Sequence, residues 1–269
     1  MSANPVSEAA HATYNSSGLR LLARIGYIAS GILHALIGLL AIAVARGASG
    51  AEADQSGALA QVAQTPGGVF VLWVLVIGLA ALGLWLVVSA FLSRSGDKKK
   101  RVSHFVNNFA KGAVYIVLSL TALVFALGGT TSSSSSTSDL STRIMSSPGG
   151  VFAIAAIGLA IFGVGVYFLV KGIGRKFKKD ITVPRGVAGK AVIALGIFGY
   201  VAKGIALGVV GILFLIAAAT ANPAKADGLD SGLKTLATLP FGSTILIVVG
   251  VGLIAYGAYC VVRARFAHL

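Results

Sequence analysis

Six long runs of apolar residues constrain this chain more than any other feature of its sequence. Two of them, residues 25–44 and 69–92, contain no Asp, Glu, Lys or Arg and approach the roughly 20 residues that a helix needs to cross a hydrocarbon core. Runs without alternating polar positions exclude a membrane β-barrel and favour helices, which pair their own backbone groups in lipid. We therefore expect an all-α, polytopic integral membrane protein with transmembrane helices at residues 25–44, 69–92, 106–127, 151–170, 201–219 and 245–262.

The charged residues are few and unevenly placed. Only 11% of the residues are charged and 56% are hydrophobic, a balance that excludes a water-soluble globular domain. The net charge of +14 would favour nucleic-acid binding in a soluble protein, but here the bases concentrate in alternate segments and report topology. By the positive-inside rule we expect both termini to face the cytoplasm, and we expect no nucleic-acid partner. The bases assigned to the cytoplasm are Arg20, Arg24, Arg94, Lys98, Lys99, Lys100, Arg101, Lys171, Arg175, Lys176, Lys178, Lys179, Arg185, Lys190, Arg263 and Arg265.

A rival interpretation makes the first run a signal peptide. Arg20 and Arg24 precede it, and it ends in the small residues Ala43-Val44-Ala45. The run is longer than a usual signal core, and equivalent helices recur later in the chain, where no signal could operate. We therefore prefer a membrane span.

The even-numbered runs repeat a pattern. Each is preceded by a proline, and the 17th residue after that proline is a glycine, followed two residues later by an aromatic side chain. The short stretches before the prolines predict interfacial helices on the outer face, while the serine-rich residues 130–138 are expected to form a flexible outer loop. The recurring residues are Pro66, Gly83 and Trp85, then Pro148, Gly165 and Tyr167, then Pro240, Gly257 and Tyr259.

The odd-numbered runs repeat as well, with small residues two helical turns apart. Small residues on one face let another helix approach closely, which is how helices pack in lipid. Gly26-Tyr27 and Gly199-Tyr200 precede this pattern in the first and third copies, whereas the second copy has Asn107-Asn108. The predicted packing residues are Gly31, Gly38, Gly112, Ser119, Gly204 and Gly211.

These repeats define the expected domain organisation. An N-terminal cytoplasmic tail (residues 1–18) precedes three units of two transmembrane helices each, residues 19–97, 98–183 and 184–269. Three units in the same orientation are expected to pack around a pseudo-threefold axis along the membrane normal.

The pattern resembles the bacterial membrane family known as domain of unknown function 1206, over about residues 19–266. The resemblance implies three tandem two-helix repeats and a cell-membrane location, and it brings no activity. The residues that carry it are Gly26-Tyr27, Ser30-Gly31, Lys111-Gly112, Gly199-Tyr200, Lys203-Gly204, the three proline-containing segments and the three pairs ending at Trp85, Tyr167 and Tyr259.

Three ionisable residues inside the runs are candidates for an anion or lipid site. His34 lies near the middle of the first run, but its repeat equivalents are Tyr115 and Leu207, which favours a structural histidine. Lys111 and Lys203 share one repeat position, and the sequence favours long amines that extend to headgroup water over a binding site.

The sequence supports two functional hypotheses. The first is a non-enzymatic membrane scaffold that binds anionic lipid on its cytoplasmic face or a protein partner. The second is a small-solute or ion pathway with Lys111, Lys203 and His34 near a central axis. No nucleophile with a base, metal-ligand cluster or phosphate loop is present, so we expect no enzyme and no cofactor.

Overall fold

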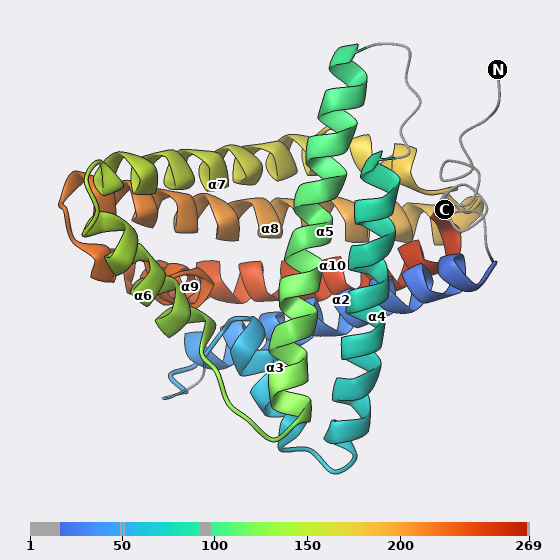
Figure 1. The fold of residues 1–269 in the computed structure, drawn as a ribbon. Helices are drawn as coiled ribbons and strands as arrows, with labels where there is room; N and C mark the ends of the chain where they lie inside the picture. The colour runs from blue at the N-terminus through green and yellow to red at the C-terminus, as the bar shows by residue number, and fades with distance from the viewer. Residues whose placement is uncertain (1–16, 49, 51, 92–97, 268–269) are drawn as a thin grey trace.

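The computed structural model describes residues 17–48, 50, 52–91 and 98–267. The predicted N-terminal tail lies almost wholly outside the described residues, and so does Arg94. Within these residues six helices are long and apolar enough to cross a membrane, which confirms an all-α, multi-pass membrane protein (Figure 1). They are α2 (Ser17–Ala45), α4 (Gly68–Phe91), α5 (Lys98–Ala126), α7 (Gly150–Ile173), α8 (Gly186–Ala219) and α10 (Gly242–Phe266).

The fifth span is longer than the sequence prediction. α8 begins at Gly186, 15 residues before the expected start at residue 201. The added residues are mostly apolar, and Lys190 within them is exposed, so the helix runs continuously from the basic end into the apolar core.

Three short helices cover the face opposite the basic segments, which we call the cap face. They are α3 (Gln55–Ala63), α6 (Ser133–Met145) and α9 (Leu229–Thr238), and each ends shortly before a repeat proline, as predicted. The expectation of a flexible loop at residues 130–138 is wrong, because most of that stretch belongs to α6. Ser132 caps this helix, and the hydroxyls of Ser136 and Thr137 donate to carbonyls one turn earlier, at 2.8 and 2.7 Å.

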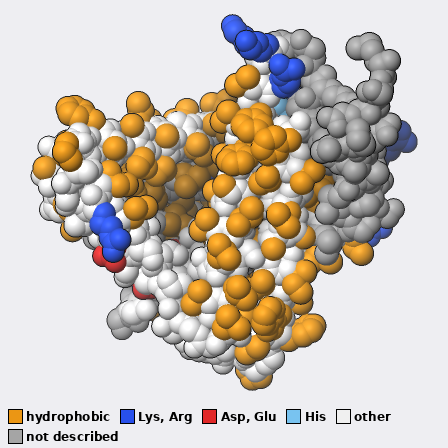
Figure 2. Space-filling view, viewed as in Figure 1, with side chains coloured by type: hydrophobic (Ala, Val, Ile, Leu, Met, Phe, Trp, Pro, Cys, Tyr) orange, Lys and Arg blue, Asp and Glu red, His pale blue; other side chains and the backbone are white. Residues whose placement is uncertain are grey.

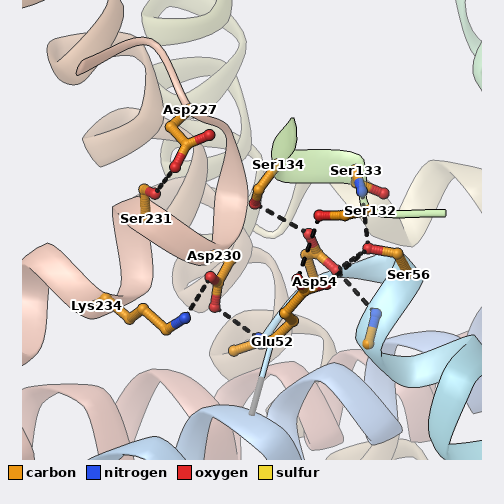
Figure 3. Close-up of polar contacts among 12 residues, drawn as sticks. Glu52, Asp54, Ser56, Ser132, Ser133, Ser134, Asp227, Asp230, Ser231 and Lys234 are labelled. Atoms are coloured by element: carbon orange, nitrogen blue, oxygen red, sulfur yellow. Dashed lines mark hydrogen bonds and ion pairs between the residues drawn. The ribbon is translucent and has the colours of Figure 1, made fainter. Parts of the chain in front are cut away.

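Buried acids connect the three cap helices (Figure 3). The Asp54 carboxylate caps α3 by accepting from Gly57 N at 3.0 Å, and it also accepts from Ser134 Oγ of α6 at 3.3 Å. Asp230 of α9 accepts from Ala53 N at 2.8 Å, next to α3. These bonds explain why acids are tolerated beside an apolar core, since each carboxylate is compensated by several donors.

Three junctions between repeats are built from facing glycines. A Cβ placed on Gly31, Gly112 or Gly204 would lie 2.7 to 2.8 Å from a backbone oxygen of the next helix, so only glycine permits this approach. Each odd-numbered span thus packs on the last span of the preceding repeat, and the first span packs on the last span of the chain. The facing pairs are Gly31 with Gly257, Gly112 with Gly83, and Gly204 with Gly165.

At each of the three junctions the two helices contact each other again two turns further along. There a Cβ on Gly211 would lie 2.5 Å from Phe162 N, and Ser119 Oγ donates to Val76 O at 2.8 Å. Gly38 packs equally closely on Gly250. Both contacts recur at all three junctions, as the repeats of the sequence predict.

The ring of helices is open inside the second repeat. α2 packs on α4 and α8 packs on α10, whereas among the described residues α5 does not pack along α7. The closed repeats use glycines: a Cβ on Gly26 would overlap Gly78 O, and one on Gly199 would lie 2.6 Å from Tyr256 Cα. Asn107 holds the equivalent position in the second repeat and is exposed. A side chain of that size does not allow the same approach, and the α4–α5 pair crosses the other four spans at a steep angle (Figure 1).

Candidate functional site

Two ionisable side chains meet at the middle of their spans. His34 lies 11 residues from each end of the span Ala23–Ala45. Lys203 lies 17 residues after the first residue of α8 and 16 before the last. At 1.5 Å per residue, both lie roughly 16 Å or more from the ends of their helices.

His34 links Lys203 to the backbone of α2. His34 Nδ1 lies 2.7 Å from the carbonyl oxygen of Ser30, and His34 Nε2 lies 3.0 Å from Lys203 Nζ. A carbonyl can only accept, so Nδ1 carries the ring proton and Nε2 accepts a hydrogen bond from the lysine ammonium. The expectation that the Lys203 amine extends to headgroup water is wrong, because the amine turns inward to this histidine.

Aromatic rings complete the surroundings of the Lys203 ammonium. Its Nζ lies 4.4 Å from the ring centroid of Tyr256 and 5.2 Å from that of Phe168. Such contacts contribute about 0.5–2 kcal/mol each, without neutralising the charge. Within the described part of the chain Lys203 has no carboxylate partner. We call Lys203, His34 and Tyr256 the central cluster.

Further polar groups approach the central cluster. Lys111, half-buried on α5, lies within electrostatic range of Lys171, Arg263 and Lys203. Ser30 is only 1% exposed, and its Oγ lies near the Tyr115 hydroxyl without a well-formed hydrogen bond to any described residue. The interior of the ring is therefore positively charged and retains an unused hydrogen-bonding group.

The side of the interior that faces the basic segments is closed by a strap, residues 174–185, which contains the 3₁₀ helix η1 (Lys176–Asp180). Phe177 is fully buried and stacks on Tyr200 at 5.5 Å between ring centroids, with its edge toward Tyr259 at 5.4 Å. Asp180 pairs with Lys171 at 2.6 Å and so holds the strap to α7.

A hollow runs along the open side of the ring (Figure 2). Hydrophobic side chains line most of it, and a space of about 300 Å³ lies at its cap end, between α6, α7 and α8. Ile157 of α7 and Phe214 of α8 line this space. Phe214 is 11 residues from Lys203, which is three helical turns, so both side chains lie on one face of α8.

The structure brings together two of the three predicted site residues. Lys203 and His34 are bonded, while Lys111 approaches the same interior from α5 without a direct contact. Sequence reasoning missed Tyr256, whose repeat equivalents are the apolar Leu82 and Val164, so no repeated signal marks it. It also missed Asp180, although an acid alone among the bases between α7 and α8 is a usable signal.

Comparison with known proteins agrees with the repeat architecture. Residues 25–93, 106–175 and 198–267 each match the family described as Domain of Unknown Function (DUF1206). The chain is 30% identical over 258 residues to "Uncharacterized protein YxxB" of Bacillus subtilis (strain 168), covering 93% of this chain and 92% of that protein. No solved structure matches the chain. The three tandem matches, spaced as the three glycine junctions are, mean that this chain belongs to the DUF1206 family.

Proposed function

We propose that this multi-pass membrane protein is a non-enzymatic binding protein whose central cluster holds an anionic ligand inside the bilayer. The observation that carries the proposal is the Lys203 ammonium, which lies near the middle of α8 with no carboxylate partner among the described residues. A base at the middle of a membrane helix costs about 2.5–3.5 kcal/mol on insertion scales, so it is rarely kept without a role. An anion bound to Lys203 would offset that cost.

The surrounding groups support an anion over a cation. Lys111 and Arg263 add positive charge around the interior, while Lys171 is paired with Asp180 at its edge. Ser30 Oγ, which has no well-formed hydrogen bond to a described residue, can donate one to an oxyanion. These groups match a carboxylate or phosphate ligand.

The protein's placement follows from its charges. The basic segments between the repeats favour a cell-membrane location with those segments and both termini in the cytoplasm. Exposed bases such as Lys178 and Arg265 also favour contact with anionic lipid headgroups, at about 1 kcal/mol per base near the surface. A protein partner on this face is compatible with the same charges.

The alternative, a small-solute or ion pathway, has less support. A pathway needs a route from the central cluster to the basic face, and Phe177 with Tyr200 and Tyr259 fills that end of the ring interior. A binding site that opens toward lipid needs no such route.

Thermal unfolding tests the proposal. Dioleoylphosphatidylglycerol and glycerol phosphate, added separately to the purified protein in detergent, supply the same anionic group with and without acyl chains. We expect at least one of them to raise the melting temperature of the wild type and to leave that of Lys203→Gln unchanged, because a bound ligand stabilises the folded state.

Lys225→Gln is the matched control, since Lys225 is exposed between α8 and α9 on the cap face, away from the basic segments. It should respond as the wild type does. A Lys203→Gln protein that is stabilised as much as the wild type by either probe would contradict the proposal.

A further inference from the structure

The gap in the ring of helices determines from which side a ligand can reach the central cluster. The side of entry in turn constrains the chemical class of the ligand. α5 does not pack along α7 among the described residues, and α6 spans only the cap end of the gap between them (Figure 1). Both helices are long and apolar enough to cross a membrane, and in a bilayer a gap between two spans opens toward lipid.

The hollow behind the gap is apolar at its cap end, where Ile154 and Ile157 of α7 and Phe214 of α8 line a space of about 300 Å³. Three turns along the same face of α8 lies Lys203, hydrogen bonded to His34. A molecule that contacts both this space and Lys203 needs an acidic group at one end and an apolar chain at the other.

We infer that the ligand is a lipid with an anionic headgroup, which reaches Lys203 sideways from the bilayer between α5 and α7 and leaves its acyl chain in the apolar hollow. This inference rests on the proposed function and names its ligand class. The chain gains burial against Ile157 and Phe214, while the headgroup compensates the Lys203 charge. Asn107 keeps the route open, because it replaces the glycine that closes the other two repeats.

The inference is tested by native mass spectrometry of the full-length protein in detergent with three probes. Dioleoylphosphatidylglycerol carries the anionic head and the chains, dioleoylphosphatidylcholine carries the same chains with a zwitterionic head, and glycerol phosphate carries the anion without chains. We expect phosphatidylglycerol to remain bound, and both other probes to bind about tenfold less, as loss of one charge-assisted bond or of the buried chain predicts.

Two variants test the hollow itself. Ile157→Trp fills it and should reduce phosphatidylglycerol binding about tenfold. Leu159→Trp is the matched control on the same helix, since Leu159 is 63% exposed and does not line the hollow, and it should bind as the wild type does. If Ile157→Trp does not fold, Leu140→Trp fills the hollow from α6, where Leu140 is 59% exposed.

The outcomes separate this inference from the proposed function. Glycerol phosphate that binds as well as phosphatidylglycerol, and through Lys203, would overturn the lipid and leave the anion site intact. Equal retention of phosphatidylcholine, or full binding to a folded hollow-filling variant, would also overturn the lipid inference. If no anionic probe depends on Lys203, both proposals fall.

Discussion

The residue immediately before the glycine at position 31, 112 or 204 is Ser30 in the first repeat and a lysine, Lys111 or Lys203, in the other two. The recurrence of lysine made both amines candidates from the sequence alone. Which of them contacts His34 was not predictable, because that contact joins α2 to α8 across 169 residues and depends on how the ring closes. The tautomer of His34 likewise follows only from the carbonyl that its Nδ1 faces.

Replacement of His34 tests the inward orientation of Lys203. His34→Leu removes the acceptor of the Lys203 ammonium and should lower the free energy of unfolding by about 1–3 kcal/mol, because a buried charge loses its hydrogen bond. Lys203→Met should cost less, and adding it to His34→Leu should restore most of the loss. Thermal unfolding of the three variants gives the coupling between the residues, and additive losses would mean that the two side chains do not interact.

The junction glycines make a prediction at the same scale. Gly211→Ala should destabilise the protein by about 1–3 kcal/mol, because its Cβ would meet the backbone of α7 at Phe162. Gly208→Ala is the matched control on α8, since no atom lies within 4 Å of its added Cβ, and it should be neutral or slightly stabilising. Chemical or thermal denaturation in detergent measures both, and equal stabilities would show that α8 does not meet α7 through this face.

At the scale of elements, sequence reasoning succeeded where a local signal existed. The repeat prolines predicted where the three cap helices end, and the length of the apolar runs predicted the six spans. It failed at α6, because serine and threonine favour loops unless their hydroxyls bond back to the preceding turn, as Ser136 does. It did not predict the strap, because the burial of Phe177 depends on space that Gly196 leaves on α8.

Labelling of the native Cys260 can report whether the strap closes its end of the ring. Cys260 is 3% exposed and packs in the same cluster as Phe177. Phe177→Ala should remove the aromatic plug, destabilise the protein by about 3–5 kcal/mol and increase the labelling of Cys260 by a water-soluble maleimide. Lys178→Ala, an exposed neighbour on the strap, should leave labelling at the wild-type rate. Unchanged labelling in Phe177→Ala would mean that the strap does not seal this end of the ring.

At the scale of the whole molecule, the cap helices follow the first, third and fifth spans and the strap follows the fourth, which puts them on opposite sides of the membrane. Ser146 on the cap face and Lys178 on the strap are both exposed. In a Cys260→Ala background, Ser146→Cys should react with an impermeant maleimide added outside intact cells, and Lys178→Cys should react only after permeabilisation. Labelling of both from outside would exclude the six-span topology.

The repeats themselves were readable from the sequence, but the opening of the ring was not. Asn107-Asn108 marked a departure from the other copies, and only the structure connects that departure with the missing contact between α5 and α7. The two repeats that close have glycines at positions 26 and 78 and at positions 199 and 252, where the open second repeat has Asn107 and Ala160. The open ring is the central claim here, since the proposed ligand reaches Lys203 through it.

Disulfide cross-linking tests that claim most directly. In the Cys260→Ala background, Val76→Cys with Ser119→Cys should cross-link, because Ser119 Oγ lies 2.8 Å from Val76 O. Asn107→Cys with Ala160→Cys places thiols at the positions that correspond to Gly26 and Gly78 in the first repeat, and we expect no disulfide, since bridged Cα atoms must lie within about 7 Å. Efficient cross-linking of Asn107→Cys with Ala160→Cys in native membranes would contradict the open ring.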